Sequence, residues 1–426
     1  MEEPGALRRL AGLGAIDVGP LRRHRDFRLL FAGQALSFFG SEVTYVALPY
    51  QTFQLTHSSL AVGLLSLAEL VPLLIAPFIG GALSDAFDRR RLIQLSELGS
   101  GLCIGVLLVN SLLPNPQLWV LFVIAPASAS LYGLLRPSLD ALVPRLVTAE
   151  ELPAASALEG FRGTLGSIAG PGIAGVLIAG AGLPAAYALD VLTFAASLSA
   201  LWFMRSVPPP LEAARPSVQG VVEGIRYAWS RDELLGTYGV DIIAMFFGMP
   251  MALFPAIAEE FGGAGVLGLL YAAPAVGSLL VTVTSGWVGR VNRHGLAIIV
   301  AAAVWGAAIA GFGLAPNLPL ALAGLVVAGG ADMVSGIFRM TIWNQTIPDR
   351  LRGRLAGIEQ VSYTSGPLLG NLEAGVVASL AGVRASVVSG GVLCVAGVVL
   401  AAIALPAFRR YDARTPRSDS PLSGVL

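Results

Sequence analysis

Gly166-Ser-Ile-Ala-Gly170-Pro171-Gly172-Ile-Ala-Gly175 lies inside a long apolar run in the first half of the chain. The step from Gly166 to Gly170 has the small-xxx-small spacing that lets two membrane helices approach closely. Pro171 follows at once and removes a helix hydrogen bond, which bends a helix. The stretch therefore predicts a closely packed joint between transmembrane helices that can flex.

A second copy of this joint occurs in the second half of the chain. It reads Ser362-Tyr-Thr-Ser-Gly366-Pro367-Leu-Leu-Gly370 and keeps the order of small residue, three residues, glycine and proline. The segment 136–144 before the first copy also resembles the segment 339–348 before the second. We therefore predict two related halves. The residues expected to act as helix-packing hinges are Gly166, Gly170, Pro171, Gly175, Gly366, Pro367 and Gly370.

The composition is that of an integral membrane protein. Of the 426 residues, 55% are hydrophobic and 13% are charged, and the mean hydropathy is +0.74. Soluble domains carry about a quarter charged residues. The apolar runs are repeatedly about 20 residues long, which suits transmembrane helices, and they lack the alternation of a membrane barrel. We predict an all-α integral membrane protein with twelve transmembrane helices in two pseudo-symmetric six-helix bundles.

The basic residues indicate the orientation in the membrane. All 27 of them are arginine, and with the N-terminus in the cytoplasm all except Arg384 fall at or near cytoplasmic helix ends. Cytoplasmic loops of membrane proteins carry this excess of positive charge. The predicted division is a cytoplasmic N-terminal tail (1–27), an N-terminal six-helix bundle (28–204), a cytoplasmic linker that could hold a surface helix (205–232), a C-terminal six-helix bundle (233–408) and a cytoplasmic tail (409–426).

Three acidic residues lie near the middle of predicted transmembrane helices. Glu42 is in the first helix, Glu69 in the second and Asp332 in the tenth, and no basic side chain is expected at that depth. A charged carboxylate there costs several kcal/mol on insertion scales, so such residues usually mark a substrate or proton route. A carboxyl group without a basic partner is retained by protonation or by a cationic ligand. We expect these acids, with Gln34 and Tyr45, to form the proton-coupling or substrate site.

Each acid also has a structural interpretation. Glu42 could be hydrogen-bonded within a polar helix face, and Glu69 could bond a neighbouring helix. Asp332 could pair with Arg339 further along its own helix. Two further acids are expected near helix ends, within reach of water: Asp190 and Asp241. Knowing which acids face a common cavity would decide between these interpretations.

Charged residues also cluster at the predicted cytoplasmic helix ends. In the turn between the second and third helices, Asp85 ends a helix and precedes Arg89 and Arg90. By pairing with arginine or accepting bonds from a helix N-terminus, an aspartate there can hold the cytoplasmic side shut. We predict a cytoplasmic gate that breaks and reforms as the halves rock, with interfacial anchoring as the alternative. Its members are Asp85, Arg89, Arg90, Arg136, Asp140, Glu159, Arg162 and Arg339.

The motifs resemble those of the major facilitator superfamily. Gly81-x-Leu83-x-Asp85-x-x-x-Arg89-Arg90 is similar to the superfamily's signature between helices two and three. It departs from that signature at Ala86, where a basic residue is usual, and at Asp88, where glycine is usual. The stretch from Gly166 to Gly175 is similar to the fifth-helix motif of antiporters. The segments 27–31 and 187–194 resemble the branch that holds enterobactin and macrolide exporters.

This resemblance implies a drug/proton antiporter-type exporter of two rocking halves. The arginine that is frequent in the family's fourth helix is missing, so coupling through it is not expected. A bulky amphipathic substrate, a drug or a siderophore-like compound, would contact aromatic and methionine side chains. The candidates for that lining are Phe38, Tyr45, Met245, Phe246, Met249, Tyr271, Trp305 and Trp343.

The predicted function is proton-coupled efflux by alternating access, and the alternative is a uniporter or lysophospholipid flippase of the same fold. An enzyme is not indicated, because the chain has no His-Glu-x-x-His, nucleophile elbow or Walker loop. We expect no cofactor and no metal, with the proton gradient as energy source. The expected partners are the amphipathic substrate and the lipid bilayer, without nucleic acid. The chain is expected to be a monomer in the bacterial cytoplasmic (inner) membrane, with both termini cytoplasmic.

Overall fold

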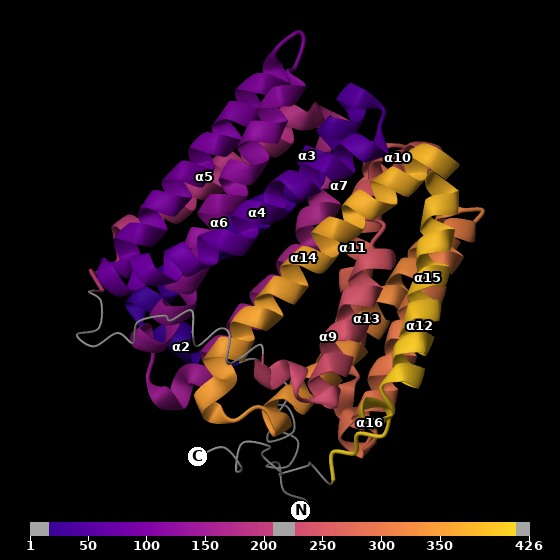
Figure 1. Ribbon diagram of the computed structural model, residues 1–426. Coiled ribbons are helices and arrows are strands. Elements are labelled where there is room, and N and C mark those ends of the chain that lie inside the picture. The colour runs from indigo at the N-terminus through magenta and orange to yellow at the C-terminus, as the bar shows by residue number, and fades with distance from the viewer. Residues whose placement is uncertain (1–16, 208–225, 415–426) are drawn as a thin grey trace, which may run out of the picture.

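The structure is a computed structural model that describes residues 17–207 and 226–414. Every regular element within these ranges is a helix (Figure 1). Most of the predicted surface helix in the linker, and parts of both predicted tails, lie outside the described residues. The side chain of Asp85 is also not described.

The first half of the chain forms seven helical elements. They are α2 (Gly19–Arg23), α3 (Arg25–Thr56), α4 (Ser59–Ala86), α5 (Arg89–Leu112), α6 (Leu118–Leu146), the 3-10 helix η1 (Ala149–Glu151) and α7 (Leu152–Trp202). Side chains cap two of the helix starts: Ser58 accepts a hydrogen bond from the Ala61 amide at 3.3 Å, and Asp88 accepts one from the Arg91 amide at 3.3 Å. Such caps satisfy amide groups that have no partner inside the helix.

The second half begins with a broken helix. Its elements are α9 (Asp232–Phe247), η2 (Met251–Leu253), α10 (Phe254–Phe261), α11 (Ala264–Val283), η3 (Ser285–Arg290), α12 (His294–Leu314), α13 (Leu318–Thr346), α14 (Asp349–Ala381), α15 (Val383–Ala404) and α16 (Pro406–Arg409). The break after α9 falls at Gly248 and Pro250, where a flexible residue and a residue without an amide hydrogen interrupt the helix.

The helix α7 contains one sharp break, at Gly182. Its backbone there has φ of 81°, a left-handed conformation that glycine adopts without steric cost. The residues on either side remain helical. Two predicted crossings, the fifth and the sixth, are therefore joined by a turn at a single residue.

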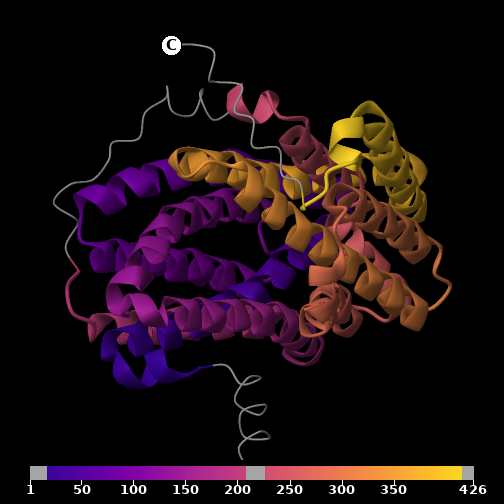
Figure 2. The ribbon, with the colours of Figure 1, turned by 90° about the horizontal axis from the view of Figure 1, so that it is seen from below.

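The helices pack in two groups that lie side by side (Figures 1 and 2). In the first, α3 packs on α7, α4 on α6, and α5 on both α6 and α7. In the second, α12 packs on α13 and α15, α11 on α13, and α9 on α14 and α15. The groups meet through α4 with α14 and through α7 with α11. We name the two ends of the molecule the α2/α16 side and the α10 side, after the elements that Figure 1 places there.

Nine helical segments within the described residues are long and apolar enough to cross a membrane. One of them, Ala149–Trp202, includes the break at Gly182. The long helices α3 and α14 are not among the nine. The structure is therefore that of an all-helical, multi-pass membrane protein.

Candidate functional site

A cavity of about 450 Å³ lies along the first group of helices, at its border with the second. It is lined by α3, α4, α5, α6 and α7, and by residues of η2, α11 and α14. The residues singled out from the sequence that it brings together are Gln34, Phe38, Glu42, Tyr45, Glu69, Arg136, Arg162, Asp190, Tyr271 and Pro367. The other candidates for the lining do not line it: Met245, Phe246, Met249, Trp305 and Trp343. Asp332 lies elsewhere, in the second group.

Glu42 and Glu69 reach this cavity from neighbouring helices. Glu42 lies on α3, where its carboxyl group is hydrogen-bonded by the Ser167 hydroxyl of α7. Glu69 lies on α4 and lines the same cavity, and Tyr45 is close enough to both acids to interact with their charges. No salt bridge forms to either acid within the described residues, so both carboxyl groups face the cavity without a basic partner.

On the α10 side, aromatic and amide contacts lie beside the cavity. The Tyr45 hydroxyl contacts the Met251 sulfur at 3.1 Å, and the Tyr45 ring meets the Tyr271 ring edge-on at 5.5 Å. Asn371 of α14 donates to Ser66 of α4 at 3.2 Å and accepts from the Ala252 amide at 3.1 Å. The contacts of Tyr45 and Ser66 join the two groups of helices beside this end of the cavity.

Near the other end of the cavity, the predicted gate residues pair within the first group. Arg162 pairs with Glu159 at 2.6 Å, and Arg136 pairs with Asp140 at 3.4 Å. The guanidinium of Arg162 also donates to the Gln34 carbonyl at 2.9 Å. Neither pair crosses to the second group. On the α2/α16 side, these four residues therefore form no ion pair between the two groups.

Arg89 and Arg90 tie α5 to neighbouring helix ends. Arg89 donates to the Ala141 carbonyl of α6 at 3.0 Å. Arg90 donates to the Leu201 carbonyl of α7 at 2.8 Å. Carbonyl groups at helix C-termini carry partial negative charge, which cationic side chains stabilise.

Glu97 is a buried acid that was not predicted to be part of the site. It lies on α5, is 1% exposed, and accepts hydrogen bonds from the Gln34 side chain at 2.8 Å and the Ser37 hydroxyl at 3.1 Å. Gln34 is therefore held by Glu97 rather than directed at Glu42. A glutamate inside an apolar run could have indicated a buried acid. Because Glu97 is close in sequence to Arg89, Arg90 and Arg91, it resembled a charged residue at a helix end.

The expectation that Asp190 and Asp241 reach water is wrong. Asp190 is 0% exposed and is hydrogen-bonded by the hydroxyl groups of Thr44 and Thr193. Asp241 is 5% exposed and is ion-paired with Arg339. Both acids lie further inside the helix packing than their positions in the apolar runs suggested.

Arg339 is the centre of a buried ionic cluster in the second group. Its side chain is 3% exposed, pairs with Asp241 of α9, and lies 3.6 Å from the Asp332 carboxylate. The guanidinium also sits 5.3 Å from the centre of the Tyr363 ring of α14. Asp332 therefore has a basic partner: the expectation that no basic side chain lies near it is wrong, and its structural interpretation, pairing with Arg339, is confirmed. The sequence placed Arg339 at a helix end, whereas its side chain reaches back to Asp332.

The glycine joints separate into two kinds of contact. Gly166 and Gly170 pack against Phe38 and Glu42 of α3, inside the first group. In the second group, Gly366 and Gly370 pack against Met245 of α9 in the corresponding way. Gly170 thus lies directly beside the Glu42 side chain.

Two residues of the first joint, Pro171 and Gly175, contact the second group at Gly268. A Cβ atom added at Gly175 would come within 3.0 Å of the Gly268 backbone on α11. At this point α7 and α11 touch backbone to backbone. We call this contact the α7/α11 seam.

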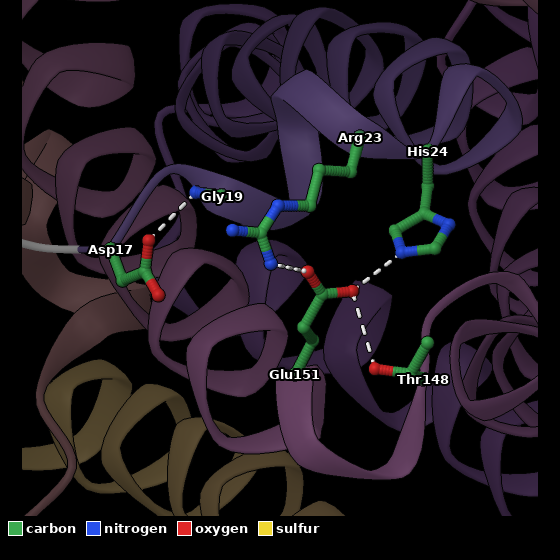
Figure 3. Close-up of polar contacts among 6 residues, drawn as sticks. All are labelled: Asp17, Gly19, Arg23, His24, Thr148 and Glu151. Atoms are coloured by element: carbon green, nitrogen blue, oxygen red, sulfur yellow. Dashed lines mark hydrogen bonds and ion pairs between the residues drawn. The ribbon is translucent and has the colours of Figure 1, made fainter.

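At the α2/α16 side, α2 is held to the turn before α7 by Glu151 (Figure 3). The Glu151 carboxylate, with its side chain 10% exposed, lies between Arg23 at 2.9 Å and His24 at 2.5 Å. Thr148 adds a hydrogen bond at 3.4 Å. The basic residues before the first apolar run indicated a charged contact at this helix end, but residue order did not identify Glu151 as the acidic partner.

We expect Glu151→Ala to release α2, because it removes the one carboxylate that joins Arg23 and His24 to the α6–α7 turn. Limited trypsin digestion of the purified protein should then cleave after Arg23 several times faster. Glu150→Ala is the control, since Glu150 is adjacent and exposed. Equal cleavage rates in both variants would show that Glu151 does not hold α2.

The comparisons with known proteins agree with this architecture. Residues 16–423 match the family described as transmembrane secretion effector. The enterobactin exporter EntS of Shigella boydii serotype 18 is 28% identical over 412 residues, which cover 95% of this chain and 98% of that exporter. The enterobactin exporter of Escherichia coli O1:K1 has the same identity and coverage.

Solved structures share the fold at low identity. A POT family transporter in complex with 5-aminolevulinic acid superposes with a TM-score of 0.72 at 12% identity, covering 90% of this chain and 97% of that one. The nucleoside transporter NupG superposes with a TM-score of 0.69 at 13% identity, covering 91% and 99%. The family match over nearly the whole chain decides the assignment. The chain belongs to the transmembrane secretion effector family of the major facilitator superfamily, and it is a multi-pass membrane transporter rather than an enzyme.

Proposed function

We propose that this protein exports a bulky amphipathic small molecule in exchange for protons, by alternating access through the cavity described above. The observation that carries the proposal is the convergence of Glu42 and Glu69, from two helices, on one cavity with aromatic walls. Its relatives are named as enterobactin exporters, which supports a siderophore-like or drug-like cargo. Such a molecule offers the ring systems that Tyr45, Tyr132 and Tyr271 can contact.

The same proposal includes twelve membrane crossings in two bundles of six. Nine segments qualify by length and apolar composition. The break at Gly182 divides one of them into two crossings, and α3 and α14 are long enough to add two more. The polar content of α3 and α14 is explained because both line the cavity.

We place the α2/α16 side in the cytoplasm of a bacterial inner membrane. The arginines Arg22, Arg23, Arg25 and Arg28 lie at that side, as the positive-inside bias requires. The α10 side then faces outward, and the contacts among Tyr45, Met251 and Asn371 close it. The conformation is accordingly inward-facing, with the cavity available to cytoplasmic substrate.

In this mechanism, proton and substrate compete for the same carboxyl groups. Substrate enters from the cytoplasm while Glu42 and Glu69 are free to bind it. When the α10 side opens, protons from outside neutralise the two acids, and the substrate loses its attraction to the cavity. Return to the inward-facing conformation releases the protons. The inward proton gradient therefore drives export, and the transporter works as a monomer with no cofactor.

A vesicle transport assay tests the coupling. Enterobactin and a lipophilic fluorescent dye serve as probes, and transport is compared with and without an imposed pH gradient. We expect Glu42→Gln and Glu69→Gln, singly or together, to remove the acceleration by the gradient while leaving downhill movement of the probe. Glu373→Gln is the matched control, since Glu373 is a helix acid that does not line the cavity.

If the double variant Glu42→Gln/Glu69→Gln retains gradient-driven export, the proposed coupling is wrong. Transport by the unmodified protein that ignores the gradient would identify a uniporter. Acceleration of a fluorescent lysophospholipid, with no movement of enterobactin or dye, would identify the flippase alternative.

A further inference from the structure

A second hollow lies on the outer surface of the second group, away from the cavity. Its volume is about 660 Å³, and it shares no lining residue with the cavity. Its walls are α11, α12 and α13 and its end is η3. Apart from Arg293, the lining side chains are apolar. We call it the α11–α13 groove.

Glycines bring two walls of the groove together. A Cβ atom added at Gly277 of α11 would come within 2.7 Å of the Gly330 amide of α13. The backbones of the two helices therefore touch at the floor. Larger side chains stand along the rim, including Leu280 at 56% exposed and Val300 at 53% exposed. The α11–α13 groove therefore lies between helices that are long and apolar enough to cross the membrane, and it is open at the surface of the protein.

One end of the groove carries positive charge and an aromatic ring. Arg293 lines the groove, Arg290 ends the adjoining η3, and both are exposed. Within the described residues, no salt bridge forms to either arginine. Trp287 of η3 lines the same end and is 37% exposed. Tryptophan is enriched at membrane–water interfaces, where an amphipathic ring is stable.

The groove has the length of one membrane leaflet. From Arg293 to Val304, both of which line it, a rise of 1.5 Å per residue along α12 gives about 16 Å. This is about half of a hydrocarbon core of roughly 30 Å. An acyl chain lying in the groove would therefore end near the bilayer midplane, with its headgroup beside Arg293.

We propose that the α11–α13 groove is a binding site for one anionic phospholipid. An acyl chain lies between α11 and α12 over the glycine floor, and the phosphate of the headgroup contacts Arg293 and Arg290. The occupant is a lipid because the walls are membrane-spanning helices and the groove opens away from the cavity. It is an anionic lipid because two exposed arginines stand at the headgroup end, where basic pockets between helices recognise such lipids.

Native mass spectrometry of the detergent-solubilised full chain tests the site. The probes are phosphatidylglycerol and phosphatidylcholine with identical acyl chains, titrated separately. We expect one phosphatidylglycerol to remain bound under conditions that remove phosphatidylcholine. Arg293→Gln and Arg290→Gln should each weaken phosphatidylglycerol binding about fivefold, since an arginine near a membrane surface contributes about 1 kcal/mol to the attraction of anionic lipid.

Ala297→Phe tests the acyl-chain part of the site, because Ala297 lines the groove and a phenyl ring would fill it. This variant should lose the bound phosphatidylglycerol altogether. The matched controls are Arg22→Gln, an exposed arginine on the same side of the molecule, and Val392→Phe, which adds a ring at an exposed position of α15. Both controls should bind phosphatidylglycerol as the unmodified protein does.

Equal binding of both lipids, or equal losses in the arginine variants and the Arg22→Gln control, would overturn the proposal in favour of non-specific lipid. A dimer that Ala297→Phe dissociates would show that the groove joins two copies of the chain and would also overturn it. If Ala297→Phe does not fold, the arginine variants decide alone. Transport activity does not enter the readout, so the result is independent of the proposed export function.

Discussion

Replacing Arg339 with glutamine should destabilise the protein by about 3–5 kcal/mol, the usual loss when one partner of a buried ion pair is removed. Arg339 and Asp241 are 3% and 5% exposed, so their pair has almost no access to water. The variant leaves the Asp241 carboxylate buried opposite a neutral amide. Thermal unfolding of the variant and the unmodified protein, measured at the same lipid and detergent concentrations, should show a markedly lower midpoint temperature for the variant.

Two further variants separate this explanation from general damage. Arg339→Met combined with Asp241→Leu removes both charges of the buried pair and should recover most of the lost stability, because the carboxylate that remains, Asp332, has a side chain that is 43% exposed. Arg384→Gln breaks the pair with Glu260, whose side chains are 44% and 43% exposed, and should cost less than about 1 kcal/mol. If the double variant is no more stable than Arg339→Gln, packing by the arginine and not its charge explains the loss.

Gly268→Val should open the α7/α11 seam and abolish most of the coupled transport that we propose. The added side chain would meet the Pro171 carbonyl and the Gly175 backbone, and backbone atoms cannot move aside as a flexible side chain can. Overpacking of this kind costs typically 1–3 kcal/mol. If this cost falls on the conformation that is closed on the α10 side, the ratio of open to closed protein rises roughly five- to 150-fold.

Thiol labelling measures that shift directly. In a background lacking Cys103 and Cys394, Ser41→Cys places a thiol on the cavity wall. A membrane-impermeant reagent added on the α10 side should label it faster when Gly268 is replaced by valine. Gly172→Val is the control on α7, since a Cβ atom there meets nothing within 4 Å. Unchanged labelling in Gly268→Val would mean that the seam does not close this side.

Much of the fold could be predicted from the sequence, because apolar runs of membrane length and the placement of arginine are read directly from residue order. The joint around Gly170 could also be predicted, since small residues spaced four apart mark one helix face. What this face touches could not be predicted. Gly170 contacts Glu42 within the first group, whereas Gly175 contacts the second group, and residue order alone does not distinguish these contacts.

The site was predicted in part for a similar reason. Glu42 and Glu69 were conspicuous because each stands alone in an apolar run, and both line the cavity. Asp332 was equally conspicuous, but the arginine that pairs with it lies two helical turns away in sequence, and only the direction of the side chains brings the two charges together. Glu97 was hidden by neighbouring arginines that point elsewhere.

The turn at Gly182 leaves no spare chain between the two long arms of α7. Two helices joined by a loop can slide past each other, because the loop takes up the displacement. Two helices joined by a single residue can change the angle between them but cannot slide apart. The arm that carries Gly175 at the α7/α11 seam and the arm that carries Asp190 are therefore joined end to end at Gly182, so that neither can slide without displacing the other. Movement at the border with the second group would in this way be carried straight to the hydrogen bonds that Asp190 makes with α3.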